Sequence, residues 1–136
     1  MYVCISFIVP VQSVRFSVIS EDMTEKMIVA DEEEILLVEN TQSGVACTAT
    51  VNGSLTPPAV RMVVDSEDRT HLFTASEQSR VAEEKSGVGL FYSEMKLTYY
   101  SQKPVPDWNE KSLVCVATVE GSPEVTATVS IIVQCE

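Results

Sequence analysis

The chain has 136 residues, which is enough for one domain with a substantial hydrophobic core. Its 20 acidic residues outnumber the 9 lysines and arginines, and the formal net charge is −11. Phosphate binding needs clustered Lys and Arg, and the sequence has no such cluster. We therefore expect no nucleic-acid partner and no anionic membrane surface. A basic protein partner is compatible with this negative charge.

The N-terminal segment 1–10 is apolar but lacks the basic start and the small-residue cleavage site of a signal peptide. We interpret it as an interdomain lead-in or the remnant of a preceding strand, with one domain over 11–136. We expect the chain to be a piece of a longer secreted or membrane-anchored protein. The acidic run 31–34 predicts a solvated turn, with calcium binding as the alternative, although no spaced Asp/Asn/Gly ligand loop accompanies it.

Alternating apolar and polar residues recur along the chain and predict about seven to eight strands. Valine, threonine and serine are abundant, and turn signals separate the segments. We predict no strand in the polar stretch 21–26 and a loop at 103–109. The polar segment 77–89 has no pattern that assigns it to a strand or a loop. The pattern predicts an all-β antiparallel sandwich. The expected strands are 14–18, 35–38, 44–51, 59–65, 70–74, 91–100, 112–119 and 125–133.

Two cysteines 68 residues apart open nearly the same pentapeptide. Cys47 begins Cys-Thr-Ala-Thr-Val and Cys115 begins Cys-Val-Ala-Thr-Val, and each pentapeptide is followed by a turn and then by proline. The pattern indicates equivalent strands in facing sheets. We expect one buried disulfide to join Cys47 to Cys115, with apolar residues of both strands around it.

The four cysteines also indicate an oxidising compartment, because small β-rich domains with several cysteines are mostly extracellular. Asn52-Gly53-Ser54 is an N-glycosylation acceptor in a predicted loop. We therefore expect an extracellular location for the chain, as part of a secreted or single-pass membrane protein.

These residues resemble an immunoglobulin-superfamily domain. The resemblance rests on Cys47 and Cys115 with their strands and on the tail 122–134, and it covers most of 10–134. The tail looks like the end of a second, constant-type domain, as in nectins, nephrin-like adhesion molecules and sialic-acid-binding lectins. The segment 8–11 looks like a junction with an earlier domain. The resemblance implies a Greek-key sandwich and a preceding immunoglobulin-like domain in the full-length chain.

The sequence departs from this family pattern at three positions. Domains of this family usually carry a buried tryptophan on strand C, which packs against the disulfide. The matching strand here, 59–65, has no tryptophan, and we expect Met62 to fill that space beside the disulfide. Leu113 stands where a tyrosine usually precedes the second cysteine. The single tryptophan, Trp108, lies just ahead of the second cysteine strand, where we expect it to plug one end of the core.

Cys4 and Cys135 are harder to pair. In this fold the start of the first strand and the end of the last strand lie at opposite ends, so an internal bridge needs the first ten residues to fold back. The alternatives are unpaired thiols or bonds to a neighbouring domain or another chain.

The sequence holds no recognisable catalytic motif. His71 is the single histidine and has no cysteine or carboxylate at ligand spacing, and paired carboxylates such as Glu83-Glu84 are typical of a solvated segment. We expect no enzyme activity, no metal and no cofactor.

Binding is the class of function that the sequence favours. With Cys115 pointing inward, Val114 and Val116 point outward, together with Val63 and Ile132. A contiguous apolar outer face is a candidate contact surface for a protein partner, a second copy included. Scattered surface valines are the alternative interpretation.

Two functions follow from these expectations. The first is a non-catalytic module of a cell-surface adhesion or immune-type receptor that mediates or orients protein–protein recognition. The second is a domain of a secreted innate immune protein that binds carbohydrate or microbial surfaces.

Overall fold

The computed structural model describes residues 11–28, 34–38, 42–52, 56–83, 89–101 and 108–134. Within these ranges the chain is mainly β-strand, joined by turns. The strands are β1 (Ser13–Ile19), β2 (Glu25–Met27), β3 (Glu34–Val38), β4 (Ser43–Asn52), β5 (Ala59–Val64), β6 (Glu67–Asp68), β7 (Thr74–Glu83), β8 (Gly89–Ser101), β9 (Lys111–Thr118) and β10 (Val125–Gln134), and the turn is η1 (Thr70–Leu72).

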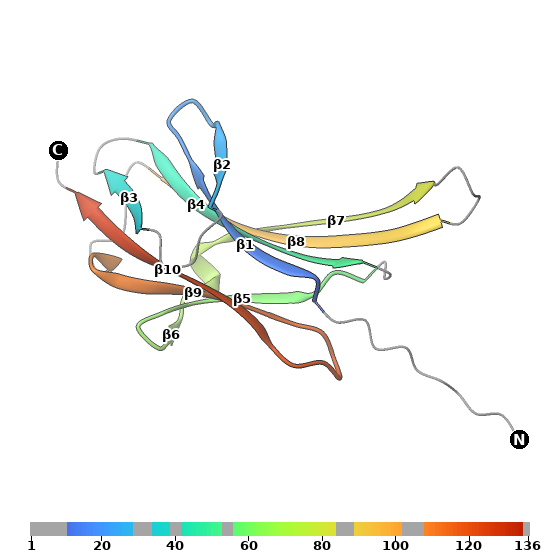
Figure 1. Cartoon of the computed structure of the whole chain (residues 1–136). Coiled ribbons are helices and arrows are strands. Elements are labelled where there is room, and N and C mark those ends of the chain that lie inside the picture. Colours follow the sequence, from blue (N-terminus) through green and yellow to red (C-terminus); the bar gives the residue numbers. More distant parts are fainter. Residues whose placement is uncertain are drawn as a thin grey trace, which may run out of the picture.

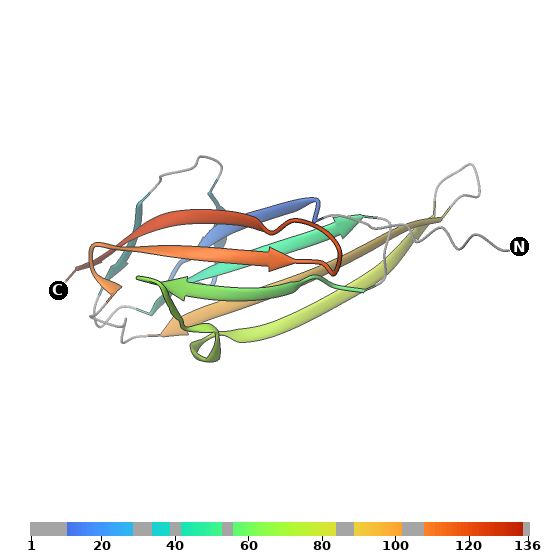
Figure 2. The same cartoon turned by 90° about the horizontal axis from the view of Figure 1, so that it is seen from below.

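The strands form two facing sheets, so the predicted β-sandwich is confirmed. One sheet has the order β2-β1-β4-β8-β7 and the other β3-β10-β9-β5-β6. Figure 1 shows the two layers edge-on, and Figure 2 shows β10, β9 and β5 as one layer in front of β1, β4 and β8. The two sheets are called below the hairpin sheet, which contains β1 and β2, and the β9 sheet.

The β9 sheet is mixed, because β3 runs parallel to β10 while the other described pairs are antiparallel. After β2 the chain therefore crosses from one sheet to the other. Ile35 and Leu37 explain the crossing, since both side chains are fully buried in the core between the layers. The strands β3 and β6 flank the three central strands that a constant-type domain would have.

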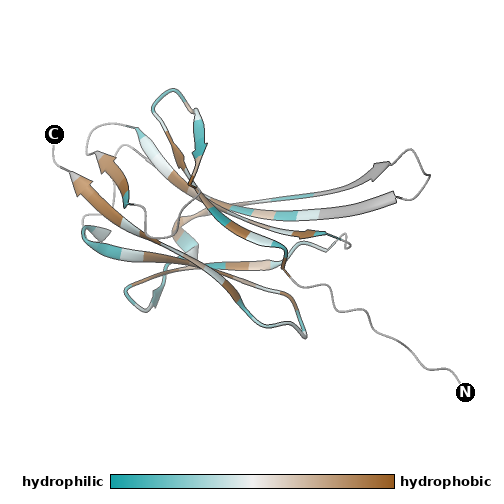
Figure 3. Ribbon diagram, viewed as in Figure 1, coloured by the Kyte–Doolittle hydropathy of each residue, from teal (hydrophilic) through white to brown (hydrophobic). Residues whose placement is uncertain are grey.

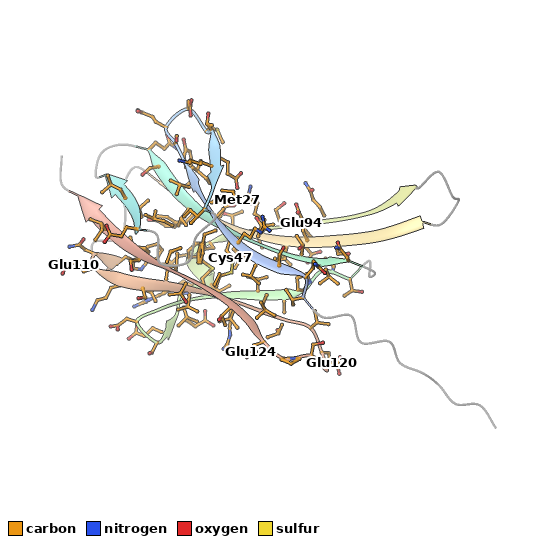
Figure 4. The ribbon with its side chains drawn as sticks, viewed as in Figure 1. Met27, Cys47, Glu94, Glu110, Glu120 and Glu124 are labelled. Carbon is orange, nitrogen blue, oxygen red and sulfur yellow. A yellow bond between two sulfur atoms is a disulfide. The ribbon has the colours of Figure 1, made fainter. Side chains whose placement is uncertain are left out.

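The expected disulfide is present at the centre of the sandwich. Cys47 of β4 and Cys115 of β9 are bonded, with their Cα atoms 6.5 Å apart, and both are completely buried. Figure 4 shows Cys47 between the two layers. Met62 of β5 lies opposite Cys115 in the register and is also fully buried, as is Leu113. The expectation that Met62 fills the space beside the disulfide is therefore confirmed.

Trp108 closes one end of this core, as the sequence predicted. Its side chain is 1% exposed. The indole ring stacks on Phe73 at a centroid distance of 5.8 Å and meets the tilted ring of Tyr99 at 5.0 Å. These three aromatic rings come from β8 and from two turns, so they join three distant parts of the chain.

Several segments differ from the sequence prediction. The expected strand 70–74 is instead the turn η1 followed by the start of β7, because Asp68 Oδ1 accepts a hydrogen bond from Thr70 N–H and Thr70 Oγ1 accepts one from Met62 N–H. Most of the unassigned segment 77–89 is the long strand β7, which pairs with β8 without interruption. A further strand, β2, lies at the end of the polar stretch 21–26.

Candidate interaction surfaces

The outer face of the β9 sheet carries the apolar residues that the sequence singled out. Val63 and Val114 lie opposite each other on β5 and β9 and are half-buried. On β10, the partner of Val114 is Thr128, and Ile132 lies four residues further along the strand. The cross-strand pair of Ser112 and Ser130 therefore separates Ile132 from the valines. The four expected residues therefore do not form one continuous patch.

Leu36 belongs to this face and was missed by the sequence analysis. It lies beside Ile132 in the parallel pairing of β3 and β10, and it is 50% exposed. Figure 3 shows β3 and the end of β10 mainly in brown, the colour of apolar residues. The run Ile-Leu-Leu-Val has no polar alternation, so the sequence could not show which of its side chains faces outward.

Val116 is less accessible than expected of an outward-facing residue. It lies opposite Arg61 in the register, yet it is only 5% exposed. Arg61 of β5 reaches Glu124, just before β10, with an N–O distance of 3.3 Å. The strand β9 lies between these two residues, so the Arg61 side chain crosses the strand that carries Val116 and helps to cover it.

The hairpin of β1 and β2 lies at one edge of the hairpin sheet. It extends that sheet beyond β1, and Figure 1 shows its loop standing away from the sandwich. Tyr100 of β8 anchors the loop, because its hydroxyl donates to the carbonyl oxygens of Ser20 and Glu21 at 3.3 and 3.1 Å. The hairpin is thus tied to a strand about 80 residues later in the sequence.

Gly44 permits the close approach of β4 to β8 beside Tyr100. It lies opposite Tyr100 in the pairing of β4 and β8. A Cβ atom at this position would overlap the carbonyl oxygen of Tyr99 and come within 3.0 Å of the Tyr100 ring. The close approach of the two strands therefore needs glycine here.

We expect Gly44→Ala to lower the free energy of unfolding by about 1–3 kcal/mol, because the clash is with backbone and no side chain can move out of its way. Urea titration followed by circular dichroism measures the change. Asn52→Ala, at the exposed end of the same strand, is the control for an alanine substitution away from this close approach. An alanine at position 44 with wild-type stability would show that the strands are not this close.

Glu25 anchors the hairpin a second time. Its carboxylate accepts hydrogen bonds from Ser17 Oγ at 2.5 Å and from Lys96 Nζ at 2.6 Å. Partial burial raises the pKa of Glu25, but the hydrogen bonds from Lys96 and Ser17 outweigh it, so the pKa lies below its ordinary value. The ion pair joins β2 to β8 across the outer face of the sheet.

This lowered pKa predicts a pH dependence of stability. A carboxylate with a lower pKa in the folded chain adds stability above its unfolded pKa, and that stability is lost as the pH falls through the folded value. We therefore expect Glu25→Gln to flatten the decline of the unfolding free energy below about pH 4.5. Glu21→Gln removes a carboxylate from the same hairpin without touching this ion pair. Equal pH profiles for both variants would contradict the prediction.

A polar hollow lies at one end of the β9 sheet. Its volume is about 530 Å³. Lys111 Nζ lies 3.5 Å from Asp65 Oδ2, and Arg69 Nη2 lies 2.5 Å from Glu67 Oε2. The charged side chains around the hollow therefore form pairs of opposite charge. The residues that line it are Val64, Asp65, Glu67, Arg69, Trp108, Asn109 and Lys111.

The remaining candidate residues of the sequence lie apart from these surfaces. Asn52 is exposed at the end of β4, where its glycosylation stays a prediction. His71 is exposed in η1. Cys4, Cys135 and the acidic residues 31–33 lie outside the described residues, while the start of β1 and the end of β10 lie at opposite ends of the sandwich (Figure 1).

The described residues bring together no group of three or more His, Cys, Asp or Glu side chains that could hold a metal ion. Within the same ranges, no helix has the length and apolar character needed to cross a membrane.

Comparison with known proteins identifies the fold and not the family. No protein-family model matches the chain, and no curated protein is similar to it in sequence. Among solved structures, the chain is similar to the crystal structure of Rst D1-D2, with a TM-score of 0.52 and 10% sequence identity. The match covers 75% of this chain and 45% of that one. The chain therefore has an immunoglobulin-like β-sandwich fold, and it spans less than half of the structure that it matches.

Proposed function

We propose that this chain is a non-catalytic immunoglobulin-like module of an extracellular adhesion or immune-type receptor, and that it takes part in protein–protein recognition. The observation that carries the proposal is the outer face of the β9 sheet, where half-buried or exposed apolar side chains stand on a disulfide-linked sandwich. Val63 and Val114 form one group there, and Leu36 and Ile132 form another. Each group offers a small apolar area that another protein can cover, and burying apolar area on contact is favourable.

A carbohydrate ligand is the second function that the sequence suggested, and it has less support. Sugar recognition commonly uses an accessible aromatic ring, whereas Trp108 behind the polar hollow is 1% exposed. Its indole face is occupied by Phe73. We therefore favour a protein partner.

The proposal can be tested with a multivalent form of the chain, since multivalency makes a weak contact measurable. We expect tetramers of the chain to bind cells that display the same chain, and we expect Leu36→Lys or Val63→Lys to reduce that binding. Leu72→Lys is the matched control, because Leu72 is also partly exposed but lies in η1, away from this face. Unchanged binding by both variants would exclude this face, and absent binding by the wild type would exclude recognition between copies.

A further inference from the structure

Met27 ends the short edge strand β2 on the outer face of the hairpin sheet. It lies opposite Ser17 in the pairing of β1 and β2, and its side chain is 46% exposed. Figure 4 labels it at the end of β2. The thioether therefore contributes little to the core, and small reagents in the solvent can reach it.

An arginine lies against this thioether. Arg15 of β1 is two residues before Ser17, on the same face of the strand, and its Nη1 donates to Met27 Sδ at 3.6 Å. Among the residues that the structure describes, no carboxylate forms an ion pair with Arg15, whereas most of the other described cations pair with an acid. A thioether is a weak acceptor and a guanidinium group carries five N–H donors. Arg15 therefore keeps donors for a better acceptor at the same place.

Oxidation converts this sulfur into a better acceptor. Hydrogen peroxide transfers one oxygen atom to a thioether: the O–O bond breaks, an S–O bond forms, and water leaves. The sulfur is oxidised by two electrons, the peroxide is reduced by two, and the product is the polar methionine sulfoxide. In a core this change disrupts packing. At Met27 the new oxygen is attached to an atom that already faces a guanidinium group, and hydrogen bonds from a cation are stronger than neutral ones.

We propose that Met27 is a modification site for peroxide-type two-electron oxidants, and that its sulfoxide oxygen binds Arg15 and fastens β2 to the sheet. This inference goes beyond the proposed role in protein recognition and does not depend on it. The strand β2 has three residues and lies at a sheet edge, where local opening is easiest and an added contact changes it most. Ile28 N–H donates to the carbonyl oxygen of Phe16 at 2.8 Å, next to Met27, and so reports on this end of the pairing.

Two other methionines serve as internal references. Met23, in the loop between β1 and β2, has φ = 67°, the left-handed conformation that usually selects glycine, and is 72% exposed. Unlike the sulfur of Met27, its sulfur accepts no hydrogen bond from a described cation. Met62 is completely buried beside the disulfide. Exposure and the contact with Arg15 together predict that Met23 reacts first, Met27 second and Met62 last.

Peptide mapping after treatment with hydrogen peroxide tests the reactivity, because mass spectrometry detects the added oxygen at each methionine separately. We expect Met27 to react more slowly than Met23, since the Arg15 N–H group engages its sulfur, and we expect Met62 to stay reduced in the folded chain. In Arg15→Ala, Met27 should react faster than in the wild type. A Met27 that stays reduced while Met23 is converted, or that reacts equally fast with and without Arg15, would overturn the inference.

Hydrogen exchange followed by nuclear magnetic resonance measures the fastening of β2. The background is Met23→Asn, which suits the left-handed turn and leaves no second oxidisable side chain in the hairpin. Conversion of Met27 to its sulfoxide should slow exchange of the Ile28 N–H by up to about fivefold, the range of an exposed charged contact. With Arg15→Ala added, the same oxidation should leave this exchange unchanged or make it faster.

Met27→Leu is the matched control for oxidation elsewhere in the chain. Treated with peroxide in the same Met23→Asn background, it should show no change at Ile28 N–H. Unchanged or faster exchange in the oxidised chain that keeps Arg15 would overturn the inference. Slowing that persists in Arg15→Ala or in Met27→Leu would do the same, because it would not come from the contact between these two side chains.

Discussion

Replacing both Cys47 and Cys115 by alanine will lower the free energy of unfolding by about 4 kcal/mol. This bond closes a loop of 68 residues, and its loss gives the unfolded chain more conformational freedom, which is the source of the estimate in the chain-entropy model. A loss of this size is a large part of the total stability of most domains. Guanidinium titration of the oxidised wild type and the double variant, followed by circular dichroism, measures it.

The controls for this prediction separate the bond from the packing. The reduced wild type keeps both sulfur atoms in the core and should lose nearly the same stability as the double variant. If the double variant is much less stable than the reduced wild type, the lost volume of the two buried side chains contributes the difference. Equal stability of the oxidised and reduced wild type would show that the bond contributes nothing.

The sequence predicted best the strands that are buried on one face. Cys47, Ala49 and Val51 of β4 are fully buried and alternate with the partly exposed Thr48 and Thr50. On β9, the fully buried Leu113 and Cys115 alternate with the exposed Ser112 and the half-buried Val114. The alternation exists because one face of each strand meets the core and the other does not. The disulfide followed from the same pattern.

The strand β7 could not be predicted in this way. Its residues 74–78 are exposed on both faces, so no apolar alternation marks them as a strand. What holds β7 in place is its backbone pairing with β8, from Thr74 opposite Thr98 to Glu83 opposite Gly89. Such pairing depends on a neighbour in space and leaves little trace in the local sequence.

The candidate surfaces were harder to predict than the strands. Val116 is covered because Arg61 pairs with Glu124, 63 residues away in the sequence. Leu36 joins the outer face because β3 crosses to the sheet of β10. The position of Met23 was invisible for a different reason, since the left-handed turn that it occupies is normally recognised by a glycine. Each of these features depends on contacts or conformations that a local pattern does not contain.

Trp108→Ala should cost about 3–5 kcal/mol of unfolding free energy, an effect as large as that of the disulfide. The indole is almost fully buried and fills the end of the core between Phe73 and Tyr99, so its removal leaves a cavity that rigid strands cannot close. Urea denaturation followed by far-ultraviolet circular dichroism is the suitable measurement, because the variant lacks the fluorescent tryptophan.

The graded variant Trp108→Phe makes this prediction specific. It keeps an aromatic ring against Phe73 but removes part of the volume, so its loss of stability should lie between zero and that of Trp108→Ala. Leu36→Ala, which removes a half-exposed side chain from the surface, should cost less than about 1 kcal/mol. If Trp108→Ala costs no more than Leu36→Ala, the indole does not plug the core.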